Sequence, residues 1–230
     1  MAMKLLITSG GTTEKIDNVR GITNHSTGRL GKTIAEKFLS EGHQVTLVTT
    51  KSAVKPSDHP NLSTHLITNV DSLITTLEPL VKTHDAIIHS MAVSDYTPVY
   101  MTDLKEVEET TDLAQLLTKR NTETKISSQA DYQVLFLKKT PKIISLIKEW
   151  NPNIQLVGFK LLVDVTQEEL FQVARASLVK NKAQFILAND LTEITGNQHH
   201  AYLLNQHQAF EAFTKDDIAN LIYEKVTEND

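Results

Sequence analysis

The sequence contains no cysteine among its 230 residues. Disulfide bonds, thiolate nucleophiles, cysteine-ligated zinc and iron–sulfur clusters are therefore all excluded. It also lacks an uninterrupted apolar run of the roughly 18 residues that a membrane-spanning helix needs, so we expect no membrane span. Only residues 1–3 precede the first apolar strand, too few for a signal peptide, and we expect a cytoplasmic protein.

An excess of basic residues is also lacking, because the formal net charge is −5. This argues against nucleic acid or a membrane surface as a partner, but leaves open one phosphorylated small molecule held by a few local groups. Hydrophobic residues make up 40% of the chain and charged residues 22%, which favours a sizeable core over disorder.

Glycine is scarce and unevenly placed. Of eight glycines, five fall close to the N-terminus, at Gly10, Gly11, Gly21, Gly28 and Gly31. Glycine permits positive φ and lets a backbone approach a ligand closely. This concentration predicts a specialised loop.

Short apolar segments alternate with amphipathic ones along most of the chain. This rhythm predicts an α/β fold: a Rossmann-like, mostly parallel sheet flanked by helices. The predicted strands cover residues 4–8, 44–49, 62–67, 85–91, 154–160, 185–188 and 201–205. The predicted helices cover residues 30–39, 70–81, 141–150, 167–180 and 215–226.

The middle of the chain breaks this rhythm. A polar helix is predicted over 103–119 and strands over 125–128 and 132–137, outside the alternation. We therefore expect one domain over 1–230 with a smaller inserted lobe, from about 96–137 and from 196–210. The pair Thr140-Pro141 predicts the N-cap and first turn of the helix that follows.

The strongest local signal follows the first strand. Residues 8–13 read TSGGTT, and residues 24–31 read NHSTGRLG and lead into a helix. Ligands of open α/β sheets bind beyond the carboxyl ends of the strands, and a helix start favours phosphate. The simpler alternative is a tight strand–helix connection.

Two familiar nucleotide-binding loops do not fit this segment. The dinucleotide fingerprint needs G-x-G-x-x-G in one short turn, whereas roughly sixteen residues separate Gly11 from Gly28. No G-K-[ST] follows, as a Walker A loop requires. The second predicted strand ends in Val48-Thr49-Thr50-Lys51, without the acidic residue that contacts NAD ribose.

Several side chains are candidates for a site at this edge. Arg20 is suited to clamp a carboxylate or phosphate, and Asn24 to donate to an oxyanion; the alternative for each is a hydrogen bond that staples the loop. Asp95 follows a strand and suits a ribose or substrate contact, or simply a turn. Phe159 is a candidate to pack over a nucleotide base, and the alternative for it is a place in the hydrophobic core.

Three lysines, Lys125, Lys138 and Lys139, are candidates to neutralise phosphates, although most surface lysines are merely solvated. Asn189 ends another strand and is a candidate to close the site. The nine histidines show no metal-binding spacing, so we expect no protein metal site. No G-x-S-x-G elbow supports a hydrolase.

These residues together resemble the phosphopantothenate–cysteine ligase family. The signature runs D-x-V-R-x-I-x-N-x-S-x-G-x-x-G over residues 17–31, and is followed by AVSDY at 92–96, VGF at 157–159 and AND at 188–190. The flavin-dependent decarboxylase that often precedes this ligase in bacteria has no counterpart here. The sequence therefore resembles the free-standing type.

The resemblance implies a two-step reaction of coenzyme A synthesis. The carboxylate of 4′-phosphopantothenate attacks the α-phosphate of CTP, giving an acyl-cytidylate and pyrophosphate. Cysteine then displaces CMP to give 4′-phosphopantothenoylcysteine. The resemblance implies Mg²⁺ on the triphosphate, not on a protein site.

The resemblance also assigns roles to residues. Asn24 matches the asparagine that binds the acyl-nucleotide, and Arg20 the arginine of the same loop. Ser26 and Gly28 match the phosphate-facing turn, near Gly10 and Gly11. Asp95 and Phe159 match positions of the nucleoside pocket, and Asn189 lies in the matching AND segment as a candidate cofactor-binding residue.

Lys125 matches the first lysine of a K-x-K-K stretch in this family. Here Ser127 and Ser128 replace the other two lysines, so Lys138 or Lys139 is expected to assist, and CTP preference over ATP stays open. The family is dimeric, which implies a homodimer joined by the inserted lobe. An NAD(P)-dependent oxidoreductase, a dinucleotide-binding regulator and a catalytically idle binding module are the competing interpretations.

Overall fold

The structure is a computed structural model that describes residues 2–196 and 198–228. Within these residues, nine strands form one sheet in the order β11-β12-β10-β9-β6-β1-β4-β5, with β13 paired to β12. Their bounds are β1 Lys4–Thr8, β4 Gln44–Thr50, β5 Leu62–Ile67, β6 Ala86–His89, β9 Gln155–Leu162, β10 Phe185–Asp190, β11 Ile194–Thr195, β12 Gln198–Leu204 and β13 Ala209–Thr214. The run from β10 to β5 is parallel, which confirms the predicted mostly parallel sheet.

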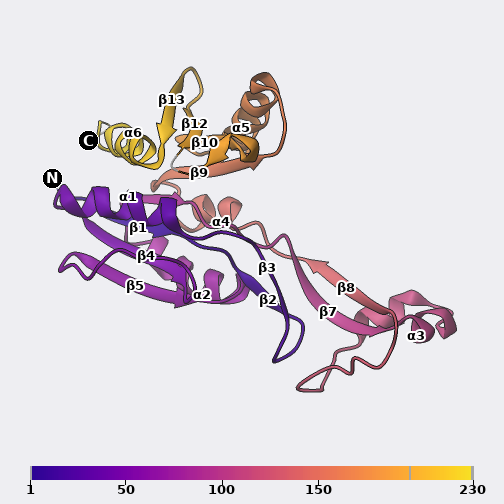
Figure 1. Cartoon of the computed structure of the whole chain (residues 1–230). Helices are drawn as coiled ribbons and strands as arrows, with labels where there is room; N and C mark the ends of the chain where they lie inside the picture. Colours follow the sequence, from indigo (N-terminus) through magenta and orange to yellow (C-terminus); the bar gives the residue numbers. More distant parts are fainter. Residues whose placement is uncertain (1, 197, 229–230) are drawn as a thin grey trace.

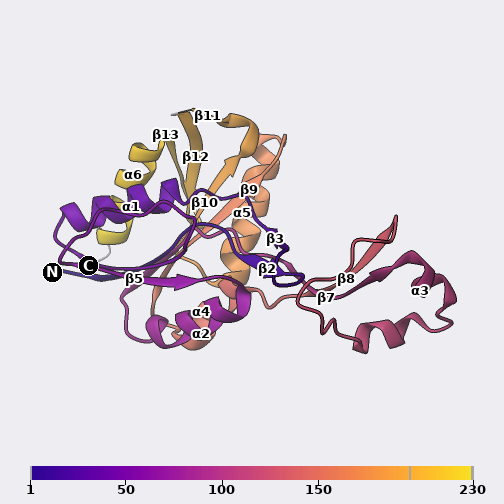
Figure 2. The same ribbon diagram turned by 60° about the horizontal axis from the view of Figure 1, so that its bottom comes forward.

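Helices cover both faces of this sheet (Figures 1 and 2). On one face α1 (Arg29–Ser40) packs against α6 (Lys215–Thr227). On the other lie α2 (Val70–Val81), α4 (Ile143–Trp150) and α5 (Gln167–Asn181). The result is a three-layer α/β architecture.

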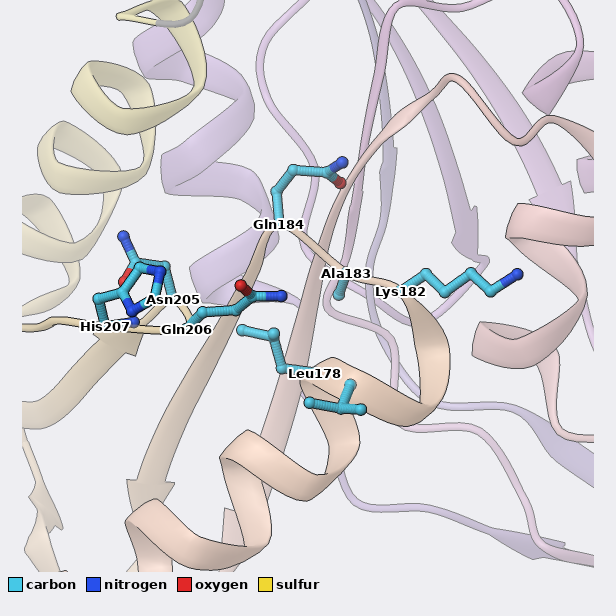
Figure 3. A pocket seen from close by; sticks show the side chains of 8 residues that line it. Leu178, Lys182, Ala183, Gln184, Asn205, Gln206 and His207 are labelled. Carbon is cyan, nitrogen blue, oxygen red and sulfur yellow. The ribbon is translucent and has the colours of Figure 1, made fainter.

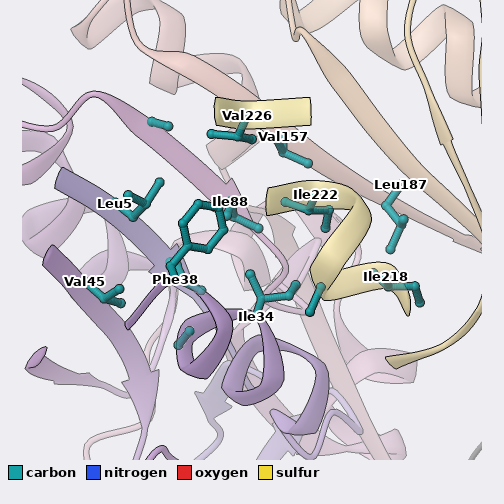
Figure 4. Packing of buried hydrophobic residues seen from close by; sticks show 14 of the residues in the cluster. Leu5, Ile34, Phe38, Val45, Ile88, Val157, Leu187, Ile218, Ile222 and Val226 are labelled. Carbon is teal, nitrogen blue, oxygen red and sulfur yellow. The ribbon is translucent and has the colours of Figure 1, made fainter. Parts of the chain in front are cut away.

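Two hydrophobic clusters hold the layers together, one on each face of the sheet. Leu5 and Ile7 of β1 enter the cluster under α1 and α6, whereas Leu6 enters the opposite cluster. Because successive strand residues point to opposite faces, a strand covered on both sides is apolar throughout. Phe38 of α1 is fully buried against α6 (Figure 4), and its loss to alanine would cost about 3–5 kcal/mol.

The strand order places a switch in direction at the centre of the sheet. From β1 the chain moves outward through β4 to β5, then returns to β6 on the other side of β1. Helix connections consequently diverge above the carboxyl ends of β1 and β6. This is the place where open α/β sheets bind their ligands.

Two hairpins extend beyond this sheet. The short pair is β2 (Thr13–Lys15) and β3 (Gly21–Thr23); the long pair is β7 (Tyr96–Asp103) and β8 (Gln133–Lys139). Residues 96–139, which we call the lobe, also carry α3 (Leu104–Glu109) and the 3₁₀ helix η1 (Leu113–Thr118). The lobe projects away from the sheet, and β2 contacts β7 at its base (Figure 1).

The structure corrects two sequence expectations for the lobe and adds one strand. The single helix over 103–119 is wrong: β7 ends at Asp103, which caps α3, and a second cap at Asp112 starts η1. The β-branched pair Thr110-Thr111 separates them. The strand over 125–128 is also wrong, because that segment has no regular structure, and β7 itself was not predicted.

Outside the lobe, the helix expected from residue 141 begins later, at Ile143. Thr140 is not its cap, because its hydroxyl donates to Ser94 O at 2.6 Å. The described part of 196–210 lies in β12 and β13 of the main sheet, apart from the lobe; Asn197 lies outside the described residues. Within the described ranges, no helix has the length and apolarity to cross a membrane.

Candidate functional site

The loops after β1 and β6 are joined above the centre of the sheet. The backbone N–H of Thr12 donates to Ala92 O at 3.0 Å, and that of Ala92 to Gly10 O at 2.9 Å. The Thr12 hydroxyl lies 3.0 Å from the Ser94 hydroxyl and accepts from the Ser94 N–H at 2.9 Å. These bonds build a rigid floor at the predicted ligand-binding edge.

Asn24 lies on this floor, half-buried. Its backbone N–H donates to Thr12 O at 3.2 Å, and its side-chain amide donates to Ala92 O and to the Ser94 hydroxyl, each at 3.3 Å. A Cβ at Gly11 would lie 2.2 Å from Asn24 O, so only glycine fits there. The structure thus places Asn24, Gly10 and Gly11 together, where the sequence predicted a site.

The turn before α1 completes this edge. Gly28, the N-cap residue, has a φ of +77°, a conformation that favours glycine. The helix has no side-chain cap and no acidic residue in its first turn. Its first N–H groups and positive dipole end are therefore suited to an anion. Ser26, half-buried in the same turn, donates its backbone N–H to Asn24 O at 3.0 Å.

Arg20 stands at the tip of the β2–β3 hairpin and is held by Asp17. Its Nε and Nη2 donate to Asp17 Oδ2 at 3.0 and 2.6 Å, and Nη2 also donates to Ile126 O at 2.8 Å. The Arg20 guanidinium holds the pKa of the Asp17 carboxyl well below its usual range. The geometry matches the stapling alternative for Arg20, and Asp17 was not among the predicted site residues.

The three candidate lysines lie in the lobe. Lys125 is exposed and adjoins Ile126, next to the tip of the β2–β3 hairpin. Lys138 and Lys139 are exposed at the end of β8, opposite Thr97 and Tyr96. Among the described residues none of these lysines forms an ion pair, which leaves their charges available to phosphates.

Asp95 follows the floor residue Ser94 and forms an ion pair with Lys142, at 2.8 Å. Both side chains are exposed, so the pair contributes little stability. Lys142, which precedes α4, was missed from sequence, where it read as one more surface lysine. Thr140 links the start of this helix to the loop after β6.

The predicted residues of β9 and β10 have different surroundings. Phe159 is half-buried and packs against the cluster under α1 and α6. Asn189 is buried, with its amide nitrogen 3.1 Å from His199 Nε2 of β12. Burial lowers the pKa of His199 to about 4, with a smaller effect from Lys215, so the neutral ring accepts this bond. The amide of Asn189 is thus committed to the neighbouring strand.

A buried histidine that sequence did not single out ends β6. His89 Nδ1 lies 2.8 Å from the Thr8 hydroxyl at the end of β1. Burial, with a smaller contribution from Lys142, lowers the pKa of His89 to about 4. The ring is therefore neutral at pH 7 and supports the floor without adding charge.

One cavity, of about 480 Å³, lies elsewhere (Figure 3). It is lined by the end of α5 and by the β12–β13 turn, with Leu178, Gln184 and His207 on its walls. Gln184 immediately precedes β10, so this cavity lies at the amino ends of the parallel strands, whereas Asn24 lies at their carboxyl ends. Across the described ranges, no group of three histidine, aspartate or glutamate side chains is arranged to hold a metal.

Comparisons with known proteins identify the family of the chain. The sequence matches the family described as DNA/pantothenate metabolism flavoprotein C-terminal domain, over residues 1–123 and 114–229. A relative in Thermococcus kodakarensis, the coenzyme A biosynthesis bifunctional protein CoaBC, is 30% identical over 227 residues, which are 97% of this chain and 50% of that protein. The chain spans about half the length of the curated relatives it matches.

Solved structures share the fold. The crystal structure of the DNA/pantothenate metabolism flavoprotein from Streptococcus pneumoniae has a TM-score of 0.96 and 56% identity, and covers 100% of both chains. A Cab2 mutant in complex with phosphopantothenate-cysteine has a TM-score of 0.72 at 18% identity, and covers 99% of this chain and 88% of its own. That likeness is one of fold. The chain therefore belongs to the DNA/pantothenate metabolism flavoprotein C-terminal domain family, which confirms the resemblance drawn from its sequence.

Proposed function

We propose that the chain is a phosphopantothenate–cysteine ligase. It activates 4′-phosphopantothenate with CTP as an acyl-cytidylate, releases pyrophosphate, and couples the acyl group to cysteine, releasing CMP. The observation that carries the proposal is the position of Asn24, whose side-chain amide donates to Ala92 and Ser94 after β6 and whose backbone N–H donates to Thr12 after β1. Its relatives of coenzyme A biosynthesis, and a fold neighbour bound to phosphopantothenate-cysteine, support the same substrate class.

The geometry suits acyl transfer without a covalent enzyme intermediate. Both steps place negative charge on oxygen, at phosphorus in the first step and at the acyl carbon in the second. The side-chain amide of Asn24 is held at this floor by Ala92 and Ser94, and the uncapped start of α1 offers free N–H groups nearby. Fixed donors of this kind stabilise a transition state because they need no reorganisation during the reaction.

The lysines of the lobe supply positive charge for the phosphates of the substrate. Lys125, with Lys138 or Lys139, neutralises the triphosphate, and Asp95 and Phe159 contact the nucleoside. Mg²⁺ would neutralise part of the triphosphate charge when it binds together with the nucleotide, since it prefers phosphate and water oxygens over a dedicated protein cage. A homodimer joined through the lobe, CTP as the preferred nucleotide and a cytoplasmic location stay predictions.

A direct assay tests this proposal. The protein is incubated with 4′-phosphopantothenate, cysteine, Mg²⁺ and either CTP or ATP. Pyrophosphate release is measured over time, and the product is identified and quantified by mass spectrometry. We expect pyrophosphate and 4′-phosphopantothenoylcysteine in equal amounts, faster with CTP. No pyrophosphate with either nucleotide would overturn the proposal. Pyrophosphate without the coupled product would leave only the activation step.

The oxidoreductase alternative is not favoured. Strand β4 ends in Thr49 and Thr50, and the Thr49 hydroxyl is committed to Ser9 O at 3.1 Å. An acidic residue is missing where NAD ribose is normally bound. A binding module without catalysis would bind CTP and release no pyrophosphate in the same assay.

A further inference from the structure

The Asp17 carboxylate joins two segments that are far apart in the sequence. Its side chain is fully buried, although it lies at the tip of a hairpin that projects beyond the sheet. Oδ1 accepts from the N–H groups of Val19 and Arg20, at 2.8 and 2.7 Å. Oδ2 accepts from Arg20 and from the N–H of Ile126 at 3.1 Å, 109 residues further along the chain.

The segment that is held in this way surrounds Lys125. The residue before it is fixed by a bond from the Asn18 N–H to Thr124 O, at 3.1 Å. The residue after it is fixed at both its N–H and its carbonyl, by Asp17 and Arg20. Lys125 therefore lies between two anchored peptides in a stretch that has no regular structure of its own.

The same hairpin leads to the floor of the site. Strand β3 begins directly after Arg20 and ends directly before Asn24. At about 3.3 Å per strand residue, the tip lies on the order of 13 Å from Asn24. An extended nucleoside triphosphate bridges such a separation.

We propose that Asp17 is a positioning residue for the ligase reaction, which fixes Lys125 relative to Asn24 through the Arg20 and Ile126 contacts. On this view Arg20 acts through Asp17 and not as a substrate clamp. The inference rests on the proposed function for its kinetic consequence. The fixed geometry of residues 124–126 is testable without it.

The kinetic test is a double-mutant cycle between Asp17→Asn and Lys125→Gln. We expect Asp17→Asn alone to raise the KM for CTP and to slow pyrophosphate release at least tenfold. In the Lys125→Gln background, Asp17→Asn should change the rate less than twofold, because the group it positions is already gone. Effects that multiply independently would overturn the inference.

Two controls separate positioning from folding. Asp131→Asn removes an exposed carboxylate of the same lobe and should leave the rate unchanged. Arg20→Lys keeps the positive charge but loses the two-pronged contact, and should show the same non-additivity with Lys125→Gln. Arg20→Lys also serves if Asp17→Asn does not fold. A thermal midpoint lowered equally in both backgrounds, with no kinetic coupling, indicates a merely structural role.

A second readout does not depend on activity. The Ile126 amide, followed in a peptide covering residues 120–130, should exchange at least tenfold faster in Asp17→Asn, whereas β8 should keep its protection. Unchanged exchange in this peptide would overturn the inference even if the parent is an active ligase. A parent that releases no pyrophosphate, but shows the exchange effect, would reject the proposed function and keep the structural coupling.

Discussion

Different interactions stabilise the floor of the site and the lobe. The floor follows buried parallel strands, and backbone hydrogen bonds, such as that from the Ala92 N–H to Gly10 O, join its loops. The lobe is an antiparallel extension with few fully buried side chains, Leu116 and Ile126 among them. It meets the β2–β3 hairpin through polar contacts of Ile126 with Asp17 and of Thr124 with Asn18. The site thus combines rigid donors on the sheet with charges on an appended arm.

The largest effect is expected at Asn24, on the floor. Asn24→Asp should lower product formation by about 10²- to 10³-fold, because a negative charge beside the acyl group disfavours the oxyanion of the second step. Acyl-nucleotide formation should survive better, so the intermediate accumulates. Quenched-flow sampling with labelled CTP measures both steps. If both continue at the parental rate, the floor does not serve the second step.

In the lobe we expect a loss of rate in the first step of the reaction and not in the second. Lys125→Gln should slow pyrophosphate release by about 10²-fold, through lost stabilisation of phosphate charge. Lys105→Gln, an exposed lobe lysine paired with Glu109, is the matched control. Should Lys125→Gln behave like its control, Lys138→Gln and Lys139→Gln decide which lysine has the role.

A third change probes how tightly the floor is built. Gly11→Ala places a Cβ against Asn24 O, and overpacking of this kind costs about 1–3 kcal/mol. Both the urea midpoint and product formation should fall. Lys15→Gln, an exposed residue of the neighbouring strand β2, should change neither. A variant as stable and active as the parent would show that the backbone around Asn24 shifts to accommodate the Cβ at little cost.

The smallest effect concerns pH. The pKa of His89 is lowered from 6.5 to about 4, so the unfolded chain binds this proton more readily. Stability from His89 is present above pH 6.5 and is lost as pH falls toward 4, by about 1–2 kcal/mol between pH 7 and 5. Urea titrations should show a smaller loss in His89→Gln, and a parental loss in His65→Gln, an exposed control. Equal losses in all three would place the pH dependence elsewhere.

The floor was largely predictable from sequence, and the lobe was not. Apolar strands and clustered glycines are local signals, so the sheet, its binding edge and the place of Asn24 followed from them. In the lobe, Asp103 and Asp112 cap two short helices where a single polar helix was expected. The pairing of β7 with β8 joins residues as far apart as Tyr96 and Lys139, which periodicity does not reveal.

The partners of the candidate residues were also beyond sequence reasoning. Arg20 and Asn189 were identified by type, but their bonds to Asp17 and His199 depend on how distant segments meet. Lys142 looked like any surface lysine until the fold brought it to Asp95. A carboxylate that ends up fully buried at a hairpin tip, as Asp17 does, has no local signature.

The pairing of α1 with α6 has a consequence for biosynthesis. Helix α1 precedes α6 in chain order by most of the fold, so α1 is made well before α6. Until α6 is made, Ile34 and Phe38 lack the α6 side chains that pack against them, so a nascent chain exposes this part of the cluster. Domains of this size are prone to aggregation while apolar surface is open. Chains that stall before residue 215 are therefore expected to need a chaperone or to be degraded.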